Sequence, residues 1–402
     1  MTKKGAFESQ FDNSLKITNC FLILSGIKIY KQPWNKFLEH FVNHQLFYYD
    51  LLILHTVIFG EIYGVIDCIQ TGKSLVKLSL NLPCITICAL ATVKIIFLHI
   101  NRRILIDVCY KLKEIHCEND KGDFVDDDFK RKIVSKGVKI LRVFVLLFFA
   151  ISVIVIAMFC IVPVLLMAYD YQKTGVLEVI YPFIVKYPYF EVYKSSWWPL
   201  IYFHQVLATG VTCVNLFGCD TLLFALCSYI DIHFRLLGRR FENIVSDSIE
   251  KTNKNLSKAV RRHQELIHLV NQTELLYSKS SLFHIITASF LICLSAFIIT
   301  IADELNVKLA YFTFLAMSLS QISMVCFFPD MLMRSSTEIS ESVYKSPWYE
   351  ADEDAKKIVL LVIIRLVGQL NIFLFGIQSY TPVFQILSSS WSYFALLKTM
   401  YK

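Results

Sequence analysis

Charged residues are scarce in this chain of 402 residues: Asp, Glu, Lys and Arg make up 18% of it, whereas hydrophobic residues make up 55%. A soluble domain usually contains about a quarter charged residues. The apolar residues are also gathered into long blocks, which favours membrane spans over one large soluble core. We therefore expect an integral membrane protein.

Enzyme signatures are missing as well. The chain has no Gly-x-x-x-x-Gly-Lys phosphate loop and no Gly-x-Ser-x-Gly nucleophile elbow, and nothing in it indicates nucleic-acid binding. His40 and His44 form its one His-x-x-x-His pair. Membrane di-iron enzymes need several such boxes, so an amphipathic surface explains this pair better. We expect no catalytic residue, no metal and no cofactor.

Two features of secreted chains are not evident either. Residues 1–16 are polar, so we expect no cleavable signal peptide, and the apolar run at 17–30 is too short to span a membrane and is predicted to be interfacial. The twelve cysteines lie mostly in apolar blocks or in segments expected to be cytosolic, which does not suit a disulfide framework. Cys84 and Cys88 lie one helical turn apart, where a metal pair is possible, but apolar neighbours favour plain packing.

Seven apolar blocks are long enough to cross a membrane, at about 20 residues each. They lie at residues 46–66, 75–98, 140–168, 199–226, 282–301, 308–328 and 376–397. The last block is the most polar because it contains five serines. That polarity suits a helix facing water or other helices, not lipid. We predict an all-α protein with seven spans.

The distribution of positive charge predicts the orientation of these spans. The segment before the first span and the loops after spans two, four and six contain 29 Lys and Arg, against 8 on the opposite side. The N-terminus is therefore predicted to be cytosolic and the C-terminus extracellular. A G-protein-coupled receptor has its N-terminus outside the cell, so this orientation argues against that class of protein. It also leaves two glycosylation motifs, at Asn255 and Asn271, unmodified in the cytosol; glycosylation there would reverse the orientation.

Two of the cytosolic segments are predicted to be helical. Residues 227–281 contain no proline and a single glycine. Apolar residues recur there at helical spacing: Ile230, Phe234, Leu237 and Phe241. Spans four and five should therefore continue as helices into the cytosol. Residues 352–370 have an acidic start and one apolar face, which predicts a further helix.

The outer loop at about 169–198 is long and rich in Tyr, Phe and Trp, and Pro182 and Pro188 interrupt regular structure in it. Two interpretations remain open: an aromatic belt at the membrane interface, or a lid over a ligand entrance.

Ionisable residues inside spans are costly and functional by default. Four of them concern us here: Asp50, Glu61, Lys94 and Asp220. Lys94 can snorkel to the interface, and Asp50 can pair with a loop cation. Asp220 and Glu61 are predicted to be structural or coupling residues, with no assigned partner.

The C-terminal quarter carries a family pattern. Ser346-Pro347-Trp348-Tyr349 precedes a charged helix, and Phe384-Gln385-Ile386-Leu387 and Ser390-Trp391-Ser392-Tyr393-Phe394-Ala395-Leu396-Leu397-Lys398 follow it. The chain resembles insect odorant receptors, in which a Trp-Tyr pair precedes the last cytosolic helix and a Ser-Tyr-Phe-x-Leu-Leu run lies in the final span. Insect gustatory receptors usually end with a Thr-Tyr run followed by Gln-Phe; a gustatory-type channel is the alternative.

The resemblance implies an odorant-gated, non-selective cation channel subunit in the plasma membrane of olfactory neuron dendrites. The partner would be the odorant receptor co-receptor, in a heterotetramer whose four final helices surround the pore. The co-receptor has a much longer fourth–fifth loop, so this chain resembles a tuning subunit. The resemblance also implies a division of the chain. Residues 1–45 form a cytosolic segment with an interfacial helix, and residues 46–226 form spans one to four with the ligand pocket. Residues 227–281 form the cytosolic anchor, 282–328 form spans five and six, 329–375 form a further anchor helix, and 376–402 form the span that lines the pore.

The final span has a face that suits a pore. Ser389, Tyr393, Leu396 and Met400 lie at steps of four, three and four, and so on one side of a helix. Four such faces would give a polar lining and an apolar collar, which can close by dewetting. The family pattern makes Leu396 and Met400 the gate and Thr399 a lining residue, while Lys398 should snorkel outward. The alternative is a packed helix with interhelical serine hydrogen bonds.

A small, mostly apolar volatile needs aromatic and aliphatic walls with few polar groups. The resemblance places such a site in the outer halves of spans two, three, four and six. The candidates there are Ile85, Cys88, Ile156, Phe159, Tyr202, Val206, Gly210, Phe312 and Leu315. Plain helix packing is the alternative for each. Tyr202 offers a hydroxyl group, and Gly210 leaves space.

Overall fold

The structure is a computed structural model that describes residues 3–30, 36–71, 75–118, 127–183, 185–187, 197–246, 248–369 and 381–401. Its helices are α1 (Lys3–Leu24), α2 (Lys36–His40), α3 (Leu46–Gln70), α4 (Leu75–Ile100), α5 (Arg102–Cys117), α6 (Asp127–Ile156), α7 (Val162–Thr174), α8 (Trp198–Glu242), α9 (Ile249–Ile301), α10 (Leu305–Lys345), α11 (Glu353–Gln369) and α12 (Thr381–Tyr401). Short turns of π- or 3₁₀-helix lie at Phe41–Gln45, Ala157–Ile161 and Trp348–Glu350.

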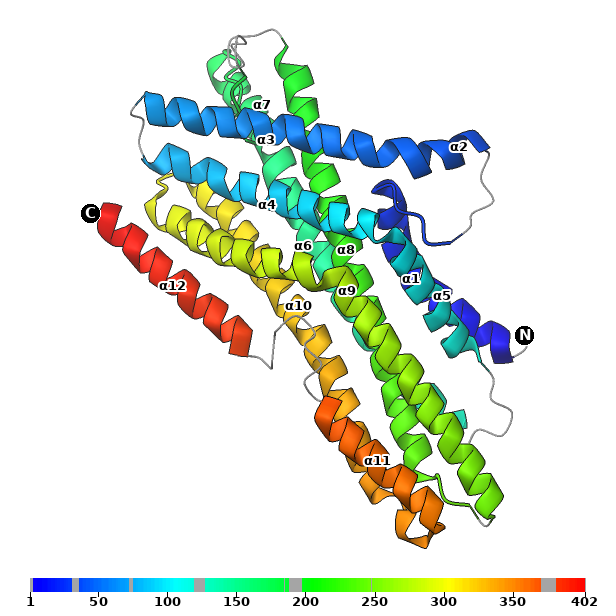
Figure 1. Cartoon of the computed structure of the whole chain (residues 1–402). Helices are drawn as coiled ribbons and strands as arrows, with labels where there is room; N and C mark the ends of the chain where they lie inside the picture. The colour runs from blue at the N-terminus through cyan, green and yellow to red at the C-terminus, as the bar shows by residue number, and fades with distance from the viewer. Residues whose placement is uncertain are drawn as a thin grey trace.

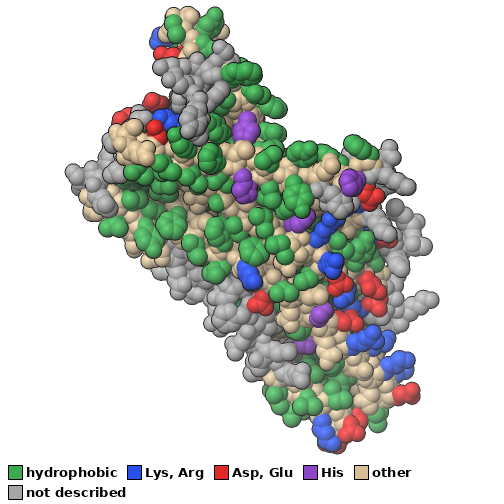
Figure 2. Space-filling view, turned by 45° about the horizontal axis from the view of Figure 1, so that its top comes forward, with side chains coloured by type: hydrophobic (Ala, Val, Ile, Leu, Met, Phe, Trp, Pro, Cys, Tyr) green, Lys and Arg blue, Asp and Glu red, His purple; other side chains and the backbone are tan. Residues whose placement is uncertain are grey.

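Six helical stretches are long and apolar enough to cross a membrane: α3, α4, α6 continuing into α7, α8, α9 and α10. They correspond to the first six predicted blocks. The seventh block is helical from residue 381, as α12. This serine-containing helix is not among the six whose mean hydropathy is high enough for a membrane span. Residues 376–380 lie outside the described part of the chain. In Figure 2 apolar side chains cover the broad middle of the molecule, and charged ones gather toward its lower end.

α8, α9 and α10 are far longer than a bilayer requires. They have 45, 53 and 41 residues, so they extend roughly 70, 80 and 60 Å at 1.5 Å per residue, against about 30 Å for the hydrocarbon core. The predicted continuation of spans four and five is confirmed, with a break at residues 243–248. α11 confirms the helix predicted at 352–370. α8, α9, α10 and α11 together form the narrow lower part of the molecule (Figure 1).

The second–third loop contains a helix that the sequence analysis did not identify. α5 buries one apolar face: Leu105, Val108, Cys109 and Leu112. Their steps of three, one and three residues are the amphipathic signal that would have found it. α5 lies beside α1 and the lower part of α9 (Figure 1).

The first helix begins earlier than the apolar run at 17–30 suggested. α1 includes the polar start of the chain and buries Phe11, Leu15 and Leu22. Ser14 Oγ lies 2.6 Å from Tyr229 Oη, and Thr18 donates a hydrogen bond of 3.0 Å to Thr221. One face of α1 therefore packs against α8, while an opposite face remains exposed.

Candidate functional site

Part of the outer aromatic loop folds into the helical bundle. Phe183 and Val185 are buried, and the Phe183 backbone N–H donates to Gln205 Oε1 at 3.1 Å. The Lys186 backbone N–H donates to the Gly60 carbonyl at 3.1 Å, and Lys186 Nζ pairs with Asp67 at 2.6 Å. These contacts tie the loop to both α3 and α8. For this stretch they favour the lid interpretation.

The ends of the same loop behave differently. Tyr169, Tyr171 and Trp197 are exposed, as side chains of an interfacial aromatic belt are. The described flanks of the loop are therefore exposed, whereas Phe183, Val185 and Lys186 contact the bundle, and both interpretations stay open.

An aromatic group gathers beneath the covering segment. The Phe159 ring lies 6.0 Å from Phe183, 6.0 Å from Tyr311 and 5.6 Å from Phe314, measured between centroids. Phe159 was predicted from the sequence, but the other three were not. Tyr311 and Phe314 lie three residues apart and so on one face of α10, but Phe312 and Leu315 have the same spacing, so the sequence does not single out the former pair.

The other predicted pocket residues in α4, α6 and α8 have the following surroundings. Tyr202 donates from its hydroxyl to the Cys160 carbonyl at 2.8 Å, and Cys88 Sγ lies 3.6 Å from Thr212 Oγ1. Ile85, Ile156 and Val206 are half-buried. Gly210 has no atom within 4 Å of where a Cβ would lie, and it shares a side of α8 with the exposed Phe203 and Leu207. The Tyr202 hydroxyl already has an acceptor.

Two predicted pocket residues do not join this group. Phe312 is 59% exposed, and Leu315 packs against a separate cluster that contains Ala288 and Ile292. Both lie one position along α10 from the inward-facing Tyr311 and Phe314. Each step along a helix rotates a side chain by about 100°, so this offset directs Phe312 to the exposed side of α10 and Leu315 toward α9.

Glu61 is buried beside the same group. Its side chain is fully buried in α3, and neither carboxylate oxygen has a hydrogen-bond partner in the described part of the chain. Cys84, Cys88, Tyr187 and Tyr311 lie close enough to interact with it electrostatically. Burying a carboxyl group without a partner is costly, which makes Glu61 a candidate for ligand recognition.

A second polar cluster lies deeper in the bundle. Lys94 Nζ pairs with Asp220 Oδ1 at 2.5 Å and lies 3.1 Å from His284 Nδ1, while Gln321 donates to Asp220 Oδ2 at 3.1 Å. Lys94 therefore does not snorkel, and Asp220 has the partner that the sequence did not reveal. The cluster joins α4, α8, α9 and α10. Asp50 is also buried, and its Oδ2 has no partner among the described residues.

α12 packs on the bundle through one face only. Ser390 Oγ donates to the Ser289 carbonyl on α9 at 3.2 Å, and the Tyr393 ring stacks on Phe290 with centroids 6.0 Å apart. Leu396 is 58% exposed, and Ser389 and Thr399 are also exposed. The side chain of Met400 lies outside the described part. Figure 1 shows α12 along the side of the molecule, beside α9.

The described residues of the predicted pore face are all exposed. They are Ser389, Tyr393, Leu396 and Thr399, and of these Tyr393 also contacts α9. Lys398 is also exposed. It follows Leu396 by two residues, which is about 200° around the helix, so the two side chains leave α12 on opposite sides.

The replacement Gly60→Val is expected to displace the covering loop. A Cβ on Gly60 would lie 2.8 Å from a ring atom of Tyr187, and such overpacking costs about 1–3 kcal/mol. Proteolysis of the purified chain within residues 171–197 should become faster. Gly210→Val is the matched control, because its Cβ meets no atom within 4 Å. Equal protection of the loop in both variants would contradict the packing described here.

Comparisons with known proteins agree on one family. Residues 74–390 match the family model described as 7tm odorant receptor. Odorant receptor 85b of Drosophila melanogaster is 23% identical, over 96% of this chain and 98% of that protein; odorant receptor 85c of the same species is 24% identical, over 89% and 92%. The olfactory receptor OR5 of Machilis hrabei, solved in complex with eugenol, superimposes with a TM-score of 0.83 at 14% identity, over 98% of this chain and 99% of that one.

Proposed function

This chain belongs to the insect odorant receptor family, a family of receptors and not of enzymes, and from that premise we propose that it is an odorant-gated, non-selective cation channel subunit. One observation carries the channel proposal. α12 contacts α9 through Ser390 and Tyr393 but leaves Ser389, Leu396 and Thr399 uncovered. A helix with that polar open face is suited to border an aqueous path between subunits.

The proposed channel is a heterotetramer with the family's co-receptor, in the plasma membrane of olfactory neuron dendrites. Its N-terminus and the long extensions of α8 and α9 lie in the cytosol, and its C-terminus lies outside. The excess of Lys and Arg on one side of the spans supports this orientation. The extended helices then form the anchor that holds subunits together.

The proposed ligand is a small, mostly apolar volatile. A family member with the same fold is solved in complex with eugenol. The aromatic group around Phe159, Tyr311 and Phe314 supplies apolar walls. Glu61 is the polar group that would orient a ligand with a hydrogen-bond donor. The covering loop at residues 181–187 closes the site from the outer side.

Voltage clamp tests the proposal directly. Cells that express this chain with the co-receptor are expected to show a fast inward cation current when a panel of volatiles is applied, and cells that express either protein alone are not expected to show that odour-specific current. A slow response abolished by blocking G proteins would contradict the channel proposal. An equal current from this chain without the co-receptor would instead favour the gustatory-type channel.

A further inference from the structure

The start of α6 carries a group of exposed cations. Five basic side chains are exposed there: Arg131, Lys132, Lys136, Lys139 and Arg142. None of the five has a carboxylate within ion-pair distance in the part of the chain that the structure describes. Other exposed cations of the anchor do have one, as the pair of Lys345 with Glu341 shows. The charge at the start of α6 is therefore open to a partner outside the chain.

On the same face of α6 the cations give way to apolar residues. Lys132, Lys136 and Lys139, which we call the lysine stripe, follow each other at steps of four and three residues. Val143 and Leu146 continue this spacing, so all five lie on one side of the helix. Val143 is 56% exposed and Leu146 is 49% exposed. Because α6 continues into a stretch that is apolar enough to cross a membrane, this apolar surface suits contact with lipid.

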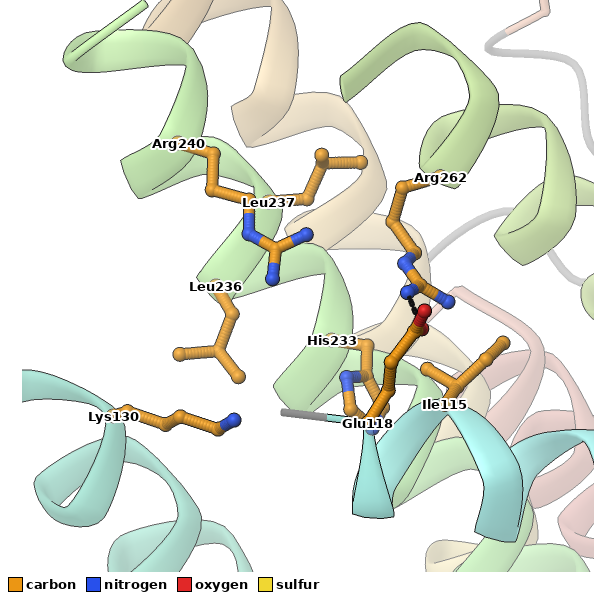
Figure 3. A pocket seen from close by; sticks show the side chains of 8 residues that line it. All are labelled: Ile115, Glu118, Lys130, His233, Leu236, Leu237, Arg240 and Arg262. Atoms are coloured by element: carbon orange, nitrogen blue, oxygen red, sulfur yellow. Dashed lines mark hydrogen bonds and ion pairs between the residues drawn. The ribbon is translucent and has the colours of Figure 1, made fainter. Parts of the chain in front are cut away.

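Lys130 shows that the open charge belongs to one face and not to the whole segment. It lies two residues before Lys132 and so about 200° around the helix. Figure 3 shows Lys130 extending from α6 toward the end of α5 and the side of α8 that carries His233. Its ammonium group also lies 5.0 Å from the centre of the Phe7 ring. Lys130 therefore points into the protein, whereas the lysine stripe points away from it.

The depth of the lysine stripe follows from helix geometry. Val143 is the first large apolar residue exposed on α6 and so marks the edge of the hydrocarbon. At 1.5 Å per residue, Lys139 lies roughly 6 Å and Lys136 roughly 10 Å before it, while a headgroup layer is about 5–8 Å thick. Side chains on a helix lean toward its N-terminus, which here directs the ammonium groups away from the hydrocarbon. Lys136 and Lys139 therefore lie at the level of lipid phosphates.

A second group of lysines has no such apolar neighbours. Lys251, Lys254 and Lys258 are exposed on α9 at steps of three and four residues, and they too have no carboxylate partner among the described residues. The next large apolar residue exposed on α9 is Leu275, roughly 25 Å beyond Lys258 at 1.5 Å per residue. That distance is about three Debye lengths at physiological salt. These lysines match the lysine stripe in charge and spacing but lie too far from the hydrocarbon to meet a headgroup.

We propose that the lysine stripe, together with Arg142, binds the headgroups of anionic phospholipids in the inner leaflet, of the phosphatidylserine class. The proposal rests on the proposed orientation, in which the start of α6 is cytosolic. Ammonium and guanidinium groups form charge-assisted hydrogen bonds with phosphate and carboxylate oxygens. Clusters of at least about four basic residues directly beside a membrane span are suited to such lipids. The acyl chains lie along the apolar part of the same face.

The packing of α6 favours lipid over another subunit as the partner. α12, the helix proposed to face the other subunits, packs chiefly on α9, whereas α6 packs on α8 and α10. The lysine stripe is therefore on a different side of the bundle from the proposed pore. α6 also continues into the turn that contains Phe159, so a headgroup bound at its start would fix the rotation of a helix that leads to the aromatic group.

Native mass spectrometry of the purified full-length chain in detergent tests the proposal. The chain is titrated with phosphatidylserine or with phosphatidylcholine of the same acyl chains, and the dissociation constant of each lipid is measured. We expect the wild type to bind phosphatidylserine more tightly. The double variant Lys136→Gln with Lys139→Gln is expected to weaken that binding roughly 25-fold, at about fivefold for each lysine, and to leave phosphatidylcholine binding unchanged. Lys132→Gln should have a smaller effect than Lys139→Gln, because it lies further from the hydrocarbon.

The double variant Lys254→Gln with Lys258→Gln is the matched control, because it makes the same change of charge on another exposed face. Weaker binding of phosphatidylserine in the α6 variant but not in this control supports the proposal. Equal weakening in both would reveal attraction to the net charge of the chain and overturn the site, and so would equal affinity of the wild type for the two lipids. Thermal unfolding checks that both variants are folded. None of these measurements requires channel activity, so a failure here would leave the proposed function standing.

Discussion

Replacing Leu396 with serine is expected to open a standing cation leak in cells that express this chain with the co-receptor. Leu396 is 58% exposed in the single subunit, on the face of α12 that we propose borders the pore. A leucine contributes about 1.5–3 kcal/mol when it is fully removed from water, and each 1.4 kcal/mol is a factor of about ten in an equilibrium. The resting open probability should therefore rise roughly tenfold or more. Whole-cell current without odorant measures it.

The matched control is Leu387→Ser. Leu387 is also exposed on α12, but it lies nine residues before Leu396 and so about 180° around the helix. It should leave both the resting and the evoked current close to those of the wild type. If Leu396→Ser left resting leak and evoked conductance unchanged, α12 would not line the conducting path, and the channel proposal would rest on family membership alone.

The parts of this fold that the sequence predicted are those that depend on local patterns. A span needs only a run of apolar residues, so the first six blocks agree with six long helices. The continuation of α8 and α9 follows from the absence of proline in 227–281 and from its helical spacing. Both patterns, the apolar run and the helical spacing without proline, are formed by residues that are close together in the sequence.

The contents of the candidate pocket were less predictable, because they depend on how each helix is rotated. α10 is apolar on most sides within the membrane, so its sequence does not say which side faces inward. Phe312 was predicted to face the pocket, but its side chain is exposed, whereas the neighbouring Tyr311 packs beside Phe159. The pairing of Lys94 with Asp220 joins residues 126 positions apart, and the insertion of Val185 depends on contacts with two other helices. No local pattern contains that information.

The Lys94–Asp220 pair gives a second large expected effect. Both side chains are buried, and removing one partner of a buried ion pair typically destabilises a protein by about 3–5 kcal/mol, because the other charge is left uncompensated. Lys94→Met should therefore greatly lower the amount of folded chain at the cell surface and the midpoint of thermal unfolding. The double variant with Asp220→Asn should recover most of the loss, because Gln321 can still donate to the amide oxygen.

An exposed pair on α5 provides the comparison that isolates burial as the cause. Lys111 and Asp107 form an ion pair at 2.8 Å with both side chains nearly half exposed, and such pairs contribute about 0–1 kcal/mol. Lys111→Met should therefore leave unfolding almost unchanged. If Lys94→Met were equally harmless, the cluster would be a dispensable contact. A different outcome is that Lys94→Met is harmful, and that the double variant folds but does not respond to odorants. The charges would then also link the pocket to α9. On α9, His284 contacts Lys94 and lies five residues before Ser289, whose carbonyl accepts the hydrogen bond from Ser390 of α12.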